Sequence, residues 1–79
     1  MTFQELVDVI KDCLDDVVFN YNNKYCSVTS IVIDSIPIFT LRFGDFTKQF
    51  NDAEQLVNDK FFNGKSLKDI FNTIKIELY

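Results

Sequence analysis

Histidine is missing from this 79-residue sequence, which also contains only two cysteines, two glycines and one proline. Without histidine, the commonest acid–base side chain and zinc ligand is unavailable, which argues against both kinds of site. Cys13 and Cys26 are too far apart to form a metal-binding pair, so both are expected to be small apolar core residues in a reducing compartment. Few glycines and prolines, with 47% hydrophobic residues, indicate a folded chain rather than a disordered one.

Long apolar runs and a basic leader are also missing. No stretch approaches the roughly 18 apolar residues of a membrane span, so we expect one soluble, cytoplasmic domain over residues 1–79 with no membrane partner. The net charge is −4, and residues 1–23 carry all of this excess, with five acids against Lys11. Because binding to nucleic acid needs a basic surface that neutralises phosphates, this charge argues against a nucleic-acid partner.

The first segment has the pattern of an amphipathic helix. Thr2 and Glu5 are spaced as a capping box, in which each side chain binds the backbone N–H of the other residue. Apolar residues then recur at helical spacing, and this predicts a helix over residues 3–18. The apolar residues are Phe3, Leu6, Val7, Ile10, Leu14 and Val17.

Later segments give weaker local signals. Residues 20–24 read as a loop, and residues 25–33 fit either a strand, from their β-branched content, or a long ordered loop. Asp52 is placed to cap a short helix, and Asn63-Gly64 is typical of a chain reversal. Ser66 and Asp69 resemble a second capping box, which predicts a last helix ending near Ile76.

Two templates compete over residues 34–50. In the helical template Ser35 is the N-cap, Pro37 lies in the first turn, and aromatic residues follow at helical spacing. In the strand template Gly44-Asp45 is a hairpin turn. That turn would pair Phe43 with Phe46, Leu41 with Lys48 and Phe39 with Phe50, with Thr40, Arg42, Thr47 and Gln49 on the other face. Periodicity fits both templates.

Asp34-Ser35-Ile36 resembles the Asp-Ser-Leu/Ile signature of acyl and peptidyl carrier proteins. Three further features are similar to that family: the acidic first helix, the apolar Ile31-Val32-Ile33 before the Asp-Ser pair, and a closing segment over residues 66–74. A helix N-terminus at Ser35 would also stabilise a phosphodiester on its hydroxyl, because the first N–H groups of a helix are unpaired. The helical template and the resemblance therefore point to one function.

The resemblance implies an all-α fold, a four-helix carrier-protein bundle. Ser35 would bear 4′-phosphopantetheine, attached by a phosphopantetheinyl transferase, and the arm would hold acyl or aminoacyl groups as thioesters. Asp34 would help to position the magnesium-bound donor during attachment. Ile36, Phe39 and Phe43 would offer a docking strip to acyl-loading and acyl-transferring enzymes. Such a carrier is a monomer and catalyses nothing itself.

The strand template leads to two other functions. A helix, a three-stranded meander and two helices would give an α+β fold similar to small acidic phage-encoded inhibitors, including some anti-CRISPR proteins. Those proteins occupy a basic groove of a host enzyme, and the acidic first segment would suit that role. Alternatively, Ile31, Ile33 and Ile38 would lie on an exposed sheet face and form a dimer.

Overall fold

Helix α1 (Phe3–Lys11) begins at the capping box that the sequence predicts. In the computed structural model, which describes residues 1–13 and 15–79, the Glu5 N–H donates to Thr2 Oγ1 (3.1 Å) and the Thr2 N–H donates to Glu5 Oε1 (2.8 Å). The helix stops because Cys13 has a left-handed backbone, with φ of 54°. The predicted continuation to residue 18 is therefore wrong after Lys11; Leu14, which that prediction included, lies outside the described residues.

Four antiparallel strands follow in chain order, joined by three two-residue turns. They are β1 (Val17–Tyr21), β2 (Lys24–Ile33), β3 (Ile36–Phe43) and β4 (Phe46–Phe50). Both residues have positive φ in the Asn22-Asn23 and Asp34-Ser35 turns, as type I′ requires, whereas Gly44 (φ 61°) fits the first position of type II′. These turn types match the twist of neighbouring strands, so residues 17–50 form one meander.

The all-α four-helix bundle predicted from the carrier-protein resemblance is wrong, because residues 36–50 form strands β3 and β4. The register is the one given by the strand template: Phe43 pairs with Phe46, Leu41 with Lys48 and Phe39 with Phe50. A helix would have turned Asp45 and Gln49 toward the core, whereas in the structure Gln49 lies on the opposite face of β4 and Asp45 lies in the exposed β3–β4 turn. The α+β alternative has the right element types, but it counted three strands, whereas the sheet has two more, one before the predicted meander and one at the end of the chain.

The chain then returns across the sheet in short helical turns. Asp52 caps α2 (Ala53–Asn58) as predicted, with its Oδ1 accepting from the Glu54 N–H (3.0 Å). The tight turn at Asn63-Gly64 is also present, with a bridge between Phe62 and Lys65. These turns place Phe62 fully inside the core.

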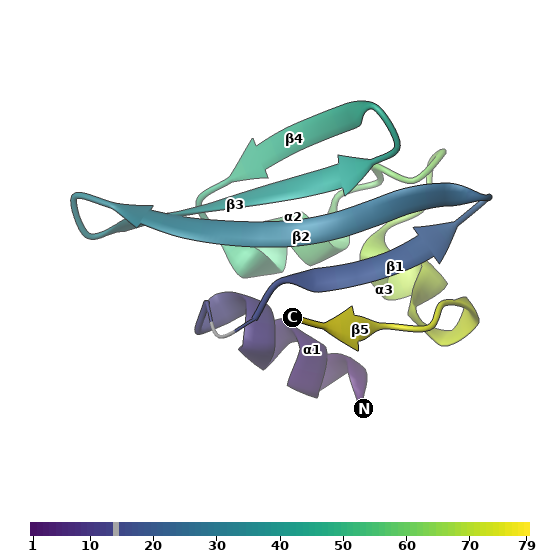
Figure 1. Ribbon diagram of the computed structural model, residues 1–79, viewed down its shortest axis with the longest axis horizontal. Coiled ribbons are helices and arrows are strands. Elements are labelled where there is room, and N and C mark those ends of the chain that lie inside the picture. Colours follow the sequence, from purple (N-terminus) through teal and green to yellow (C-terminus); the bar gives the residue numbers. More distant parts are fainter. Residues whose placement is uncertain (14) are drawn as a thin grey trace.

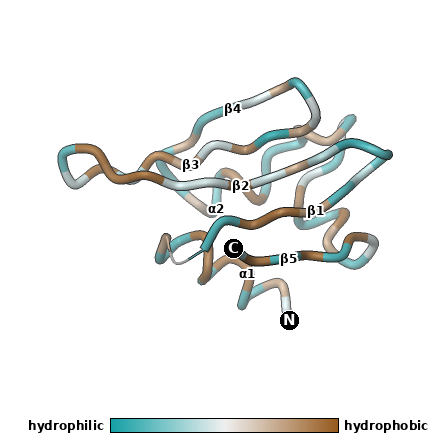
Figure 2. Tube along the Cα trace, viewed as in Figure 1, coloured by the Kyte–Doolittle hydropathy of each residue, from teal (hydrophilic) through white to brown (hydrophobic). Residues whose placement is uncertain are grey.

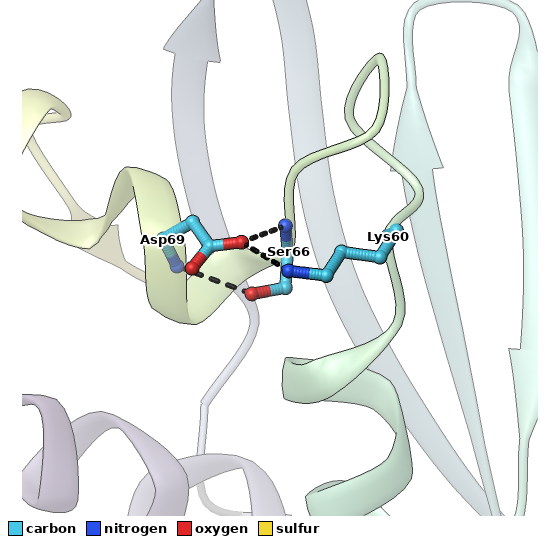
Figure 3. Close-up of polar contacts among 3 residues, drawn as sticks. All are labelled: Lys60, Ser66 and Asp69. Atoms are coloured by element: carbon cyan, nitrogen blue, oxygen red, sulfur yellow. Dashed lines mark hydrogen bonds and ion pairs between the residues drawn. The ribbon is translucent and has the colours of Figure 1, made fainter.

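The second capping box holds the start of α3 (Leu67–Ile70). Figure 3 shows Asp69 facing Ser66 and Lys60. Asp69 Oδ2 accepts from the Ser66 N–H (2.9 Å) and from Lys60 Nζ (2.8 Å), and the Asp69 N–H donates to Ser66 Oγ (3.2 Å). A 3-10 turn, η1 (Phe71–Thr73), follows, and the chain ends in β5 (Glu77–Leu78). The last helix predicted to Ile76 is therefore too long.

The five strands lie in the order β4-β3-β2-β1-β5, with β5 antiparallel to β1. The three helices pack on one face of this sheet, which we call the inner face, and Figure 1 shows α2 and α3 behind the strands. The buried core is Leu6, Val7, Ile10, Val17, Phe19, Cys26, Val28, Phe39, Leu41, Phe43, Ala53, Leu56, Val57, Phe62, Leu67 and Ile70. On the opposite, outer face, residues such as Tyr25, Thr29 and Gln49 are exposed.

The hairpin of β2 and β3 is longer than its neighbours. Pairing with β1 begins at Val28, and pairing with β4 begins at Phe39, so the segment Ile31–Ile38 is a two-stranded ribbon that we call the arm. Figure 1 shows the arm reaching past the other strands, and Figure 2 shows that most of it is hydrophobic. Among the described residues, no helix has the length and apolar character needed to cross a membrane.

Candidate functional site

Asp34 and Ser35 form the turn at the tip of the arm, and both side chains are exposed. Their φ values of 51° and 65° are positive, whereas a helix N-cap is extended. Residues after Ser35 enter β3, so no helix N-terminus presents unpaired N–H groups to this hydroxyl. The geometry thus gives no support to a phosphate site at Ser35, and attachment of 4′-phosphopantetheine stays a prediction.

The predicted docking strip is not assembled. Ile36 lies on the outer face of the arm and is 53% exposed, whereas Phe39 and Phe43 are buried in the core on the inner face. Successive residues of a strand point to opposite faces, so an even and an odd position of β3 cannot share one surface. Phe39 and Phe43 are core aromatics, and Phe43 stacks at 5.2 Å (ring centroids) from Phe62.

The arm instead exposes a different apolar set. Ile31 pairs with Ile38 and Ile33 pairs with Ile36, so four isoleucines lie together on the outer face. Ile31 and Ile33 are 58% and 50% exposed, and Ile38 is partly buried. Contiguous apolar side chains that a folded chain leaves in water are typical of an interaction surface. The signal in the sequence was an apolar run on both sides of a two-residue turn.

The β3 edge of the arm is poorly suited to adding another strand. Pro37 has no N–H, and its carbonyl accepts a hydrogen bond from Asn51 Nδ2 (3.1 Å). Val32, opposite Pro37, points to the inner side of the ribbon and is 60% exposed. At this edge, a partner can therefore contact the isoleucine side chains of the outer face more readily than it can hydrogen-bond to the β3 backbone.

A second feature of the outer face is a cleft of about 360 Å³ near β5. Its lining residues are Asp16, Val18, Tyr25, Ser27, Thr29 and Tyr79. Asp16 and Tyr79 are fixed opposite each other, because the Asp16 N–H donates to the Tyr79 carbonyl (2.8 Å) and the Tyr79 N–H to the Asp16 carbonyl (2.9 Å). A cleft with a mixed polar and apolar lining thus lies on the same face as the arm.

Comparison with protein-family models, with curated proteins and with solved structures gave no significant match. Function therefore has to be argued from the surface of this chain. Within residues 1–13 and 15–79 there is no group of three or more cysteine, aspartate or glutamate side chains arranged to hold a metal ion.

The two thiols differ. Cys26 is fully buried between β1 and β3, and this burial raises the pKa of its thiol. Cys13, after α1, is only half-buried. A buried thiol with a raised pKa is a poor nucleophile, so Cys26 has the environment of a core residue rather than of a reactive one.

Several charged side chains outside the cleft are engaged in local structure. The ion pairs of the described residues join Lys48 to Asp59 (2.7 Å) and Lys60 to Asp69 (2.8 Å). The Thr2 backbone hydrogen bond lowers the pKa of Glu5, which serves the helix cap. The acidic excess of the first segment thus includes one carboxylate with a structural role.

Proposed function

We propose that this protein is an interaction module that pairs with a second copy of itself through the outer face of the arm. The proposal rests on the exposure of isoleucines in two cross-strand pairs of the arm. The arm extends past the part of the sheet that the helices cover. Ile31, Ile33 and Ile36 are each at least half exposed, although the same sheet buries Val28 and Leu41 on its opposite face, three rows from the Ile31–Ile38 pair. Their burial requires a partner.

A second copy suits this surface because the surface is apolar and uncharged. Asp34 is the sole charged residue between Val28 and Phe39, and it lies at the tip rather than on the face. Twofold packing of two ribbons with opposite directions keeps the two Asp34 carboxylates at opposite ends. Interfaces between identical chains are the more apolar class, and twofold dimers are the commonest symmetry.

The expected affinity is modest. Burying an isoleucine completely stabilises by about 1.5–3 kcal/mol, so a half-exposed one contributes about 1 kcal/mol. Eight such side chains from two arms must offset an association cost of about 4 kcal/mol or more. About 8 kcal/mol from these side chains against a cost of about 4 kcal/mol gives a dissociation constant of about 1 mM.

The other predicted functions have less support. The carrier function depended on a helix after Ser35, and that segment is a strand. Intact-mass measurement after incubation with coenzyme A and a broad-specificity transferase would test it directly. The acidic-inhibitor function stays a prediction, since no feature reported above for the described residues points to a basic groove as the partner.

Self-association is measured by NMR diffusion and isoleucine methyl shifts over protein concentrations of about 20 μM to 2 mM. We expect the diffusion coefficient to fall toward the value of a dimer, with shifts confined to the arm. Ile33→Thr combined with Ile36→Thr should keep the monomer at every concentration, because threonine retains the strand preference but removes apolar area.

Two matched variants sharpen the result. Val32→Thr also replaces an apolar β-branched side chain by threonine, but on the opposite side of the ribbon, and should leave association unchanged. Ser35→Gly removes the hydroxyl of the carrier hypothesis and should also associate normally, with a relaxed turn. A wild-type chain that diffuses as a monomer at about 2 mM, or equal weakening by Val32→Thr, would contradict the proposal.

A further inference from the structure

The cleft beside β5 combines aromatic, hydroxyl and carboxylate groups on one small area of the outer face. Sheet register places its members together, since Val18 pairs with Ser27 and the Asp16–Tyr79 hydrogen bonds continue the β1–β5 pairing by one row. Tyr25 and Tyr79, which come from β2 and the segment after β5, are 54% and 70% exposed. Two large rings therefore stand in water next to a carboxylate.

Ser27 lies at the base of this cleft and is 6% exposed. The side-chain hydrogen bonds of the described residues include none with the Ser27 hydroxyl. Among these residues, every fully enclosed side-chain oxygen has a hydrogen-bond partner. Because Ser27 Oγ has no such partner among them, it is not fully enclosed and reaches the cleft. A nearly buried hydroxyl is thus available to a group that enters.

The electrostatic character of the cleft is negative. Asp16 lines it, and Tyr79 Oη donates a hydrogen bond to Glu77 Oε2, which brings a second carboxylate to its border. That hydrogen bond and the Glu77 charge raise the pKa of Tyr79, so the phenol stays protonated at neutral pH. Arg42 pairs with Ser27 in the sheet, but its guanidinium donates to the Gly44 carbonyl (3.3 Å), and Arg42 does not line the cleft.

We propose that this cleft binds a guanidinium group, such as the side chain of an arginine in a partner protein. The flat cation would lie against the Tyr25 and Tyr79 rings, whose faces attract positive charge. Its N–H groups would donate to the Asp16 carboxylate and the Ser27 hydroxyl, which supplies the missing hydrogen bond at the base. A quaternary ammonium ion has no donor and would leave both oxygens without a partner.

The test uses three small probes on the full chain, followed by the ring resonances of Tyr25 and Tyr79 in NMR spectra. N-acetylarginine methylamide carries the guanidinium, the citrulline analogue is its neutral isostere, and tetramethylammonium is a cation without donors. We expect saturable shifts with the arginine probe, no saturable shifts with citrulline, and binding of tetramethylammonium at least threefold weaker. Equal shifts from citrulline, or tetramethylammonium binding as tightly as arginine, would overturn the proposal.

Variants locate the site. Asp16→Asn removes the charge while keeping the backbone hydrogen bonds to Tyr79, and should weaken arginine binding about threefold to tenfold. Ser27→Ala should weaken it about twofold to fivefold. Asp45→Asn, in the β3–β4 turn, removes an equal charge that does not line the cleft and should have no effect. Equal losses from Asp16→Asn and Asp45→Asn would show only a general charge effect and contradict the site.

This inference is independent of the proposed dimer. The titration is done at about 50 μM protein, below the expected dissociation constant, where the arm is free. The Ile33→Thr, Ile36→Thr variant should bind the arginine probe as the wild type does. Failure of self-association with intact probe binding would overturn the proposed function alone, and the reverse result would overturn the cleft alone.

Discussion

The inner and outer faces of the sheet are made by the same strands but have opposite environments. In β2, Cys26 and Val28 face the helices and are fully buried, whereas Tyr25 and Thr29 face outward and are exposed. The inner face is buried because the helices cover it, with Leu6, Leu56 and Leu67 in the shared core. The alternation of strand side chains thus becomes a division between a buried face and an exposed face only where helices cover one side.

The arm breaks this division. Beyond Val28 and Phe39 no helix of the described residues covers the inner side, so Val32 is as exposed as Ile31 on the outer side. Apolar residues nevertheless continue on both sides of the ribbon. A solvated hairpin does not need apolar residues on both of its sides. The arm therefore exposes apolar surface that does not contribute to the core.

Neighbouring positions on β3 give the largest contrast between the faces. Leu41→Ala, on the inner face, should lower the free energy of unfolding by about 2–5 kcal/mol, because it leaves a cavity in the buried core. Thr40→Ala, one residue away on the outer face, should cost less than about 1 kcal/mol. Urea unfolding monitored by circular dichroism measures both. Similar losses for the two variants would show that the outer face is also packed.

Thiol reactivity compares the faces on β2. In a Cys13→Ser background the remaining Cys26 should react with a disulfide reagent at least about a hundredfold more slowly than a free thiol, because the strand must first open. Addition of Thr29→Cys should introduce a second thiol that reacts at the free-thiol rate. Rapid modification of Cys26 in the native protein would contradict the inner-face assignment.

The smallest effect concerns the α3 cap, which anchors part of the helical layer. Hydrogen bonds from Lys60 and Ser66 lower the pKa of Asp69 from its ordinary 3.8 to about 2. A depressed pKa stabilises the folded state above the unfolded pKa, and this stabilisation is lost as pH falls from about 4 toward 2.

Asp69→Asn tests this pH dependence. The variant should be less stable than the wild type at pH 5, and the difference should shrink steadily as the pH falls from about 4 to 2, as measured by urea midpoints. The Glu5 carboxylate, whose pKa is also lowered, is common to both proteins and cancels in the comparison. A difference that is constant from pH 5 to pH 2 would mean that the Asp69 charge does not contribute.

Features set by neighbouring residues were predictable from the sequence. The two capping boxes, Thr2–Glu5 and Ser66–Asp69, and the Asp52 cap are present because each needs only side chains that reach backbone groups three residues away or fewer. Of the candidate site, the dimer alternative named Ile31, Ile33 and Ile38 on the outer face, but not the exposed Ile36. The cleft was not, because Asp16, Ser27 and Tyr79 are brought together by strand pairing across the sheet.

Residues 34–50 could not be decided from the sequence, because their apolar residues fit both periods. Phe39 and Phe43 are four apart, as on a helix, yet with Leu41 they also alternate as on a strand. The sequence by itself determined the helix starts, the turn residues and most of the core. Only the tertiary structure decided strand or helix at Ser35, since a strand gains its hydrogen bonds from distant partners. It also decided which face stays open, since that depends on where the helices pack.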